Sequence, residues 1–294
     1  MFRPLITVIS LCVALESLAT GAAAPKPAAA GDRAPKSSWQ QVAPQDALSS
    51  TADSYDTQAE RHLLDLANAE RARVGSPQLK MDEGLARAAR AHAAQMASQN
   101  QLSHQFSGEA SLTQRIAAVS TLHLNRAGEN VAVAPNAANA HQGLMSSPPH
   151  RDNLLSAQFN VAGIGVFRRG HLLYVAQDFG SSTPSYSVQQ AQELVSTSVE
   201  QLRIQANLPR LQRVDSRSAQ SSACAMAKDD SLNAATPPAG AYMLRYTTMQ
   251  PETLPSAISK VIAQRGLRTY SAGSCYARTG KYPNGAYWVV LVFY

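Results

Sequence analysis

The sequence is poor in cysteine, in aromatic residues and in runs of like charge. It has three cysteines in 294 residues, and Phe, Trp and Tyr together make up 6%. The formal net charge is +6, but the basic residues are scattered and no aromatic residues alternate with them. A platform for nucleic acid combines clustered basic charge with aromatic stacking groups, so we expect no nucleic-acid partner.

Long apolar runs are absent after the start of the chain. The one near the N-terminus follows Arg3, extends to Leu15, and is succeeded by the small residues around Gly21. This order is typical of a secretory signal peptide, and the run is too short for a stable membrane-spanning helix. We therefore predict a signal peptide over residues 1–22, secretion to the periplasm or the exterior, and no transmembrane segment in the mature protein.

Several short catalytic motifs are also missing. The sequence contains no Gly-x-Ser-x-Gly, no Gly-x-x-x-x-Gly-Lys and no His-Glu-x-x-His. These motifs mark the nucleophile of many serine hydrolases, the phosphate-binding loop of nucleotide-binding proteins and the zinc helix of common metalloproteases. Those three classes lose their main support.

The rest of the chain divides into three parts by composition. Residues 23–55 are rich in Ala, Pro and Ser without periodicity, which is typical of a linker. A globular pattern starts near Thr57, and Ser181-Ser182-Thr183-Pro184 marks a later boundary. We predict one domain over 56–181 and a second, smaller domain over 182–294.

Helical and strand patterns both occur in the first domain, which predicts an α+β fold. One helix ends at Gly75, a short helix over 139–147 ends at Pro148, and two strands flank Gly170. Between them, a second helix with Asp82 as its N-cap has an apolar stripe formed by Leu85, Ala88, Ala89, His92 and Met96. Because His92 lies on that stripe, we expect a buried, hydrogen-bonded core histidine.

Three polar motifs stand out from this framework. His104 occurs in Ser-His, Glu129 in Gly-Glu-Asn, and His150 in His-Arg-x-Asn. We place each in a loop or at the end of an element, where functional groups are often displayed.

The order of these motifs resembles the CAP (SCP-like) superfamily over about residues 57–180. The resemblance implies an α/β/α sandwich with a cleft in which His104, Glu129 and His150 converge. It also implies that Asn130, Asn153 and Ser147 lie beside that site. Leu144 and Ser147 depart from the family pattern, which often has Trp at the first position and, in animal members, a second glutamate at the other.

Two imidazoles and one carboxylate are a plausible ligand set for Zn²⁺ or another divalent metal with an open coordination position. Without metal, His104, Glu129 and His150 would relay protons or hold loops together. Both interpretations remain open at this stage.

Three functions follow from these alternatives. The first is a secreted, non-enzymatic protein that binds a small apolar or cell-envelope ligand at the cleft. The second is a metal-assisted hydrolase of peptide or envelope polymer, with Glu129 as metal ligand or general base. The third is an extracellular module for protein interaction, in which the polar triad only organises loops.

The two cysteines of the second domain are predicted to form a disulfide. Removal of residues 1–22 takes Cys12 away and leaves Cys224 and Cys275, an even pair that predicts a disulfide in an oxidising compartment. A nucleophilic thiol would need a nearby base, and none is suggested.

Two segments of the second domain are also similar in sequence to segments of the first. Residues 223–227 resemble 93–97, and the region from Ala272 to Phe293 resembles the hairpin from Ala162 to Phe179. No counterparts of His104, Glu129 or His150 are present. The second domain is either a degenerate repeat that kept packing positions and lost the site, or a small α+β unit with a similar pattern by chance.

Overall fold

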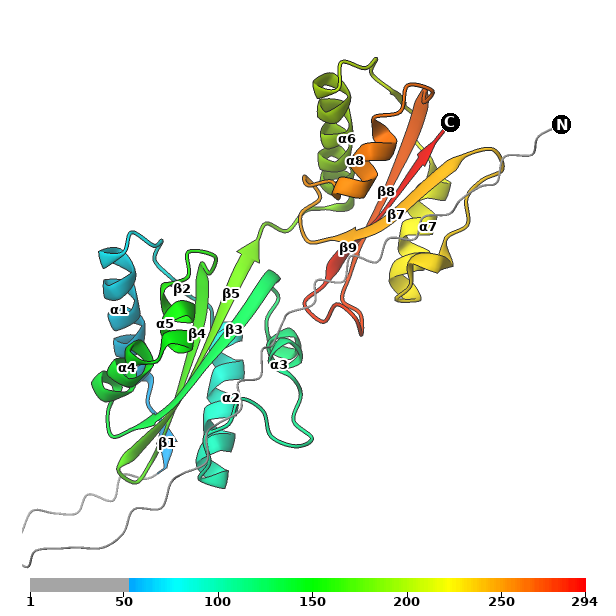
Figure 1. Ribbon diagram of the computed structural model, residues 1–294. Coiled ribbons are helices and arrows are strands. Elements are labelled where there is room, and N and C mark those ends of the chain that lie inside the picture. Colours follow the sequence, from blue (N-terminus) through cyan, green and yellow to red (C-terminus); the bar gives the residue numbers. More distant parts are fainter. Residues whose placement is uncertain (1–52) are drawn as a thin grey trace, which may run out of the picture.

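The computed structural model describes residues 53–294, so the predictions for residues 1–52, including the signal peptide and most of the linker, lie outside the described residues. The chain forms two α+β units in succession, each built on its own sheet (Figure 1). No helix within residues 53–294 is long and apolar enough to cross a membrane.

The first unit contains β1 (Ser54–Tyr55), α1 (Thr57–Arg73), β2 (Lys80–Met81), α2 (Glu83–Gln99), α3 (Leu112–Val119), β3 (His123–Ala134), α4 (Ala137–Ser146), α5 (Pro148–Leu155), β4 (Val161–Arg169) and β5 (Leu172–Thr183). The second contains α6 (Val188–Gln205), β6 (Gln212–Arg213), α7 (Arg217–Lys228), a 3-10 turn η1 (Leu232–Ala234), β7 (Tyr242–Thr248), α8 (Ser256–Ile262), β8 (Thr269–Ala277) and β9 (Ala286–Phe293).

The first sheet has the order β1-β4-β5-β3, and β2 also pairs with β4. Helices α1, α4 and α5 lie on one face and α2 and α3 on the other (Figure 1), which gives an α/β/α arrangement. Within the described residues β3 pairs with β5 alone, so its other side is an open edge where the two helical layers meet.

Helix α2 packs closely on the sheet for two local reasons. Its N-cap residue Asp82 accepts a hydrogen bond from Leu85 N at 2.9 Å, as its position in the sequence predicted. Below it, β4 has Gly163, where a Cβ atom would lie 2.0 Å from the carbonyl carbon of Leu85. The missing side chain lets the helix backbone lie directly on the strand.

The second sheet has the order β6-β8-β9-β7, with α6 and α8 on one face and α7 on the other. Strand β9 is buried along its whole length because helices cover both faces. A second small sheet region thus follows the first unit.

The predicted hairpin is confirmed: β4 has the predicted bounds and Gly170 lies in the turn at φ 57°. Strand β5, however, continues through Ser181 to Thr183, so the predicted domain boundary falls inside a strand that pairs with β3. The predicted linker likewise ends in β1, whose two residues pair with β4.

One local prediction near the candidate site was wrong, and one helix was not predicted. Glu129 lies in the middle of the 12-residue strand β3, not in a loop or at an element end. The strand escaped detection because an edge strand with polar groups on both faces lacks apolar alternation. Pro148 does end α4, but it also starts α5, since the first turn of a helix needs no backbone donor from proline.

Candidate functional site

The candidate site lies at the open edge of β3, with one histidine from each helical layer. His104 belongs to the segment between α2 and α3, whereas His150 lies in the first turn of α5. Their ring centroids are 6.2 Å apart, with an angle of 33° between the rings. The His104 side chain is 58% exposed, while that of Glu129 is 5% exposed. The structure therefore brings the three predicted residues together, with an exposed imidazole above a buried carboxylate.

Glu129 holds His104 in one orientation. His104 Nδ1 and Glu129 Oε1 are 2.9 Å apart, so the ring nitrogen donates to the carboxylate. The other carboxylate oxygen, Oε2, accepts from Arg115 Nη2 and pairs with its charge. Both oxygens of Glu129 are thus engaged by protein donors, and Nε2 is the remaining ring nitrogen of His104.

A buried ionic network extends from Glu129 towards α2. Arg115 also pairs with Glu109 Oε1 at 3.3 Å and donates to the carbonyl of His104 at 3.2 Å. His92 is fully buried and bonds Glu109 Oε1 at 2.7 Å and the carbonyl of Ser103 at 2.8 Å. The prediction of a buried, hydrogen-bonded His92 is confirmed, and its partner Glu109 ties the helix to the loop that carries His104.

Asp178 adds a second carboxyl group beneath Glu129. The two residues are direct partners in the β3–β5 pairing, so their side chains lie on the same face. Asp178 is fully buried, and its oxygens accept no hydrogen bond from a donor in residues 53–294. Burial, and next the negative charge of Glu129, raise the pKa of Asp178 well above its usual range, although Arg115 opposes the shift. Asp178 therefore keeps its proton to a higher pH than an ordinary aspartate does.

The opposite face of β3 connects the site to α5. Asn130 Nδ2 donates to the carbonyl of His150 at 3.0 Å, and Asn153 Nδ2 donates to Asn130 Oδ1 at 3.0 Å. Asn153 Nδ2 also reaches the carbonyl of Glu129 at 3.2 Å. Ser147 is the N-cap residue of α5, but its side chain makes no capping bond. The two amides thus join His150 to the strand that carries Glu129.

Burial, together with the charge of His104, lowers the pKa of His150. Since an unperturbed histidine titrates at about 6.5, His150 is neutral at pH 7. A neutral imidazole beside an oriented one can accept a hydrogen bond or a proton from a ligand.

Two of the three predicted metal ligands, His104 and Glu129, are bonded to each other. Within the described part of the chain, no three or more His, Cys, Asp and Glu side chains are grouped to hold a metal ion. Glu129 bonds His104 directly and Arg115 occupies its second oxygen, so a metal would have to displace one of these contacts. Divalent metal binding stays a prediction.

Sequence reasoning did not single out Glu109, Arg115 or Asp178. Charged side chains are ordinarily exposed to solvent, so the sequence gives no reason to select these three. What sets them apart from other charged residues is that their side chains are buried beside Glu129. Asp178 had a weak signal, because a carboxylate in the middle of an apolar strand is unusual.

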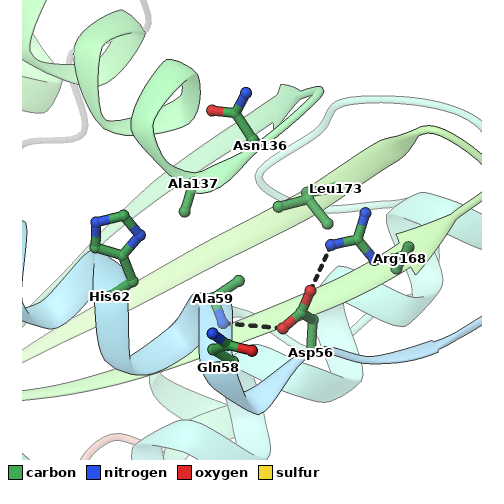
Figure 2. A pocket seen from close by; sticks show the side chains of 8 residues that line it. All are labelled: Asp56, Gln58, Ala59, His62, Asn136, Ala137, Arg168 and Leu173. Carbon is green, nitrogen blue, oxygen red and sulfur yellow. Dashed lines mark hydrogen bonds and ion pairs between the residues drawn. The ribbon is translucent and has the colours of Figure 1, made fainter.

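A pocket of about 250 Å³ lies elsewhere, between α1 and the start of α4 (Figure 2). Its lining includes Asp56, which pairs with Arg168 at 2.5 Å, and His62. None of the predicted site residues lines it. Sites for drug-sized ligands usually enclose roughly 300–1,000 Å³, so this open, partly polar pocket is small for that purpose.

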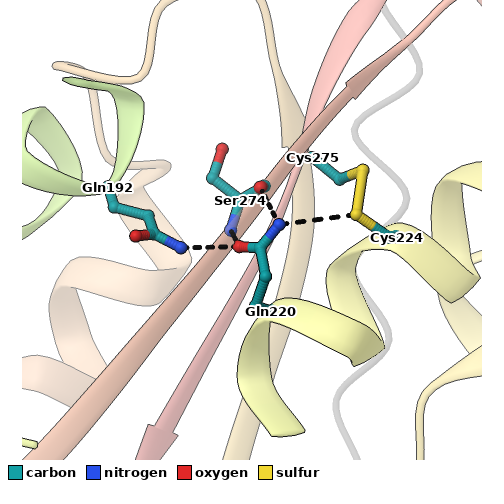
Figure 3. The surroundings of a disulfide bond; sticks show 5 residues. All are labelled: Gln192, Gln220, Cys224, Ser274 and Cys275. Atoms are coloured by element: carbon teal, nitrogen blue, oxygen red, sulfur yellow. Dashed lines mark hydrogen bonds between the residues drawn. A yellow bond between two sulfur atoms is a disulfide. The ribbon is translucent and has the colours of Figure 1, made fainter. Parts of the chain in front are cut away.

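The predicted disulfide between Cys224 of α7 and Cys275 of β8 is present (Figure 3). Beside it, Gln220 Nε2 donates to the carbonyl of Ser274 at 2.9 Å, and Ser274 N donates back to Gln220 Oε1 at 3.1 Å. The helix and the strand are therefore joined both covalently and by a side chain that caps the strand's backbone groups.

Comparisons with known proteins identify the family of the first unit. Residues 64–179 match the family model described as the Cysteine-rich secretory protein family, CAP. Two relatives come from Bacillus subtilis (strain 168): the uncharacterized membrane protein YlbC, 32% identical over 124 residues, and the uncharacterized protein YkwD, 30% identical over 114 residues. The matches cover 42% and 38% of this chain, but only 34% and 44% of those relatives.

Among solved structures, an extracellular protein containing a SCP domain from Bacillus anthracis str. Ames is similar at 30% identity. The similarity covers 42% of this chain and 41% of that one, with a TM-score of 0.40. The match to the family model spans the elements that carry His104, Glu129 and His150. Residues 64–179 are therefore a CAP (SCP) domain, similar to the domain of bacterial extracellular SCP-domain proteins.

Proposed function

We propose that this protein is a secreted, non-enzymatic binding protein whose CAP domain takes a cell-envelope ligand at His104 and His150. The observation that carries the proposal is the pair of imidazoles at the open edge of β3, one of them oriented by Glu129. An exposed, oriented histidine offers a hydrogen bond to a polar ligand with little loss of side-chain freedom on binding.

Polar envelope polymer is favoured over a small apolar ligand. His104 is exposed, and the site is lined by imidazole and carboxylate groups. The net charge of +6 adds a long-range attraction to anionic polymer. Catalysis is less well supported, since the carboxylate that a hydrolase would use as general base is bonded to both His104 and Arg115.

The test is sedimentation of the protein with purified cell-wall sacculi at physiological salt. We expect binding by the parent and its loss in the His104→Ala, His150→Ala double variant. His171→Ala, which removes an exposed histidine at the β4–β5 turn, is the matched control. Equal binding by the parent and the double variant would refute the proposal.

The same variants separate the alternatives. A calorimetric titration with Zn²⁺ that saturates in the parent and not in His104→Ala would support the predicted metal site. Turnover of envelope polymer that Glu129→Gln abolishes would support the hydrolase instead. Retention of a protein partner by the double variant would support the interaction module.

We also propose that the second unit is a degenerate repeat of the CAP domain. Arg71 in α1 and Arg203 in α6 are both fully buried, and each donates from Nε to the carbonyl of the proline six residues later. Gly273 of β8 lies against the backbone of α7 at Ala219 in the same way as Gly163 against α2. Shared buried polar contacts of this kind are a stronger sign of common origin than shared helices.

The pairing of strands supports this proposal. Across β4, β5 and β3 of the first unit, Gly163 pairs with Asp178 and Asp178 with Glu129. Across β8, β9 and β7 of the second unit, Gly273 pairs with Val290 and Val290 with Arg245. An arginine thus stands where the glutamate would be, and it donates to the carbonyl of Ala235 at 2.6 Å. The repeat predicts one ligand site per chain, which the stoichiometry of binding tests.

A further inference from the structure

The second unit makes a specific contact with the connection between α3 and β3. Arg278, which follows β8, donates from Nη1 to the carbonyl of Ala117 at 2.8 Å and from Nη2 to the carbonyl of Leu122 at 3.3 Å. Ala117 lies in α3 and Leu122 directly precedes β3. In Figure 1 the β8–β9 end of the second unit is directed towards α3. One side chain therefore holds both ends of this connection.

Aromatic rings reinforce the contact. His123, the first residue of β3, stacks on Tyr276 with ring centroids 3.9 Å apart and an angle of 6° between the planes. Tyr287 lies edge-on to the same imidazole at 6.0 Å. The hydroxyl of Tyr287 accepts a hydrogen bond from Tyr186 N at 2.8 Å, in the segment that joins the two units. The start of β3 is thus held by rings of β8 and β9.

The held segment leads directly to the site. Arg115 lies in α3, two residues before Ala117, and its guanidinium bonds Glu129, Glu109 and the carbonyl of His104. Arg115 can hold these groups only where α3 places it, because a short helix moves as a unit. The position of α3 therefore sets the orientation of Glu129 and His104.

We propose that the second unit acts as a brace, that is, it holds α3 in place beside the site. Arg278 and Tyr276 are positioning residues: they fix α3 so that Arg115 keeps its bonds to Glu129 and to the carbonyl of His104. The role assigned to the site rests on the proposed function, but the brace itself does not. A second anchor comes from within the CAP domain, where Arg87 Nη2 of α2 donates to the carbonyl of Val119 at 2.5 Å.

The test uses hydrogen–deuterium exchange on the full mature chain with its disulfide intact. Arg278→Ala and Tyr276→Leu are compared with the parent and with Arg265→Ala, an exposed arginine of the same unit. We expect amides of residues 112–123 to exchange about tenfold faster in the first two variants and at the parental rate in the control. Arg87→Ala, which loses the internal anchor, shows how much exchange the segment gains when an anchor is removed.

A second readout reports on the site itself. The rate at which diethyl pyrocarbonate modifies His104, relative to His171 of the same sample, should rise in Arg278→Ala and Tyr276→Leu and stay parental in Arg265→Ala. Faster exchange confined to residues 112–123 together with a more reactive His104 supports the brace. Parental exchange, a uniform rise along the whole chain, or an unchanged His104 overturns it. Neither measurement uses a ligand, so failure of envelope binding leaves the result intact.

Discussion

Asp178 and Glu129 lie directly opposite each other in the β3–β5 pair, with both carboxyl groups buried. Arg115 pairs with Glu129, whereas no donor in residues 53–294 bonds the Asp178 oxygens. Two buried carboxylates on directly paired residues repel each other strongly, so the pair favours a state in which one of them keeps its proton. The site therefore contains a group whose proton is coupled to folding.

The Asp178→Asn variant should be more stable than the parent at neutral pH. Because the pKa of Asp178 is raised in the folded state, the unfolded chain binds fewer protons above about pH 4, and the parent loses stability as the pH rises. Asparagine does not ionise, so the free energy of unfolding of the variant should exceed that of the parent by an amount that grows from pH 4 to pH 8. Thermal unfolding midpoints of both proteins across this range measure the difference. An advantage that shrinks as the pH rises would contradict the assignment.

The Tyr246→Phe variant should be as stable as the parent or more stable. The Tyr246 hydroxyl is buried and has no hydrogen-bond partner in the described residues, and such a group costs about 1–3 kcal/mol. Tyr174→Phe is the matched comparison, because its hydroxyl donates to Asn100 Oδ1 at 2.5 Å. Urea unfolding should show a loss of about 0.5–1.5 kcal/mol for Tyr174→Phe only. Equal losses in both variants would show that Tyr246 has a partner in solution.

Alanine at either helix-facing glycine should destabilise its unit. At Gly163 a Cβ would lie 2.0 Å from Leu85 C, and at Gly273 it would lie 2.1 Å from Ala219 O. An extra carbon atom in a well-packed core typically lowers the free energy of unfolding by about 1–3 kcal/mol, because the helix and the strand must move apart. Gly143→Ala, where no described atom lies within 4 Å, should instead stabilise α4 by about 0.5–1 kcal/mol. Similar losses at Gly163 and Gly273 in denaturant unfolding support the repeat, and tolerance of alanine at Gly273 argues against it.

Loss of the disulfide should destabilise the second unit selectively. Cys224 and Cys275 are 51 residues apart, and closing a loop of this length is worth about 4 kcal/mol in the chain-entropy model. A Cys224→Ser, Cys275→Ser double variant should therefore show earlier unfolding of Trp288, which is buried beside α7. Sacculus binding by the CAP domain reports on the other unit. Parental unfolding of the variant would mean that packing of α7 on β8 is sufficient without the covalent link.

The sequence was informative where structure depends on local pattern. Helical spacing around His92, the cap at Asp82 and the hairpin at Gly170 are set by neighbours a few residues away, and all three are present. The pairing of Cys224 with Cys275 followed from the two cysteines that remain once the predicted signal peptide, with Cys12, is removed. The order of three short motifs was sufficient to indicate the family, which the model match over residues 64–179 bears out.

The sequence failed where polar groups are placed by distant contacts. It predicted a loop at Glu129, since polar residues on an edge strand hide the alternation that marks a strand. It also carried no sign that Arg115 and Asp178 approach Glu129 from α3 and β5, because side chains of these types are usually solvated.

The sequence by itself therefore indicated helices α1 and α2, the β4–β5 hairpin, the family of the first domain and the three residues of the candidate site. Only the tertiary structure decided that Glu129 is bonded on both oxygens, that Asp178 lies beneath it, and that Arg278 bonds Ala117 across 161 residues. The physical reason is that buried charges are stabilised by specific partners, and the fold brings those partners together from positions that no local pattern connects.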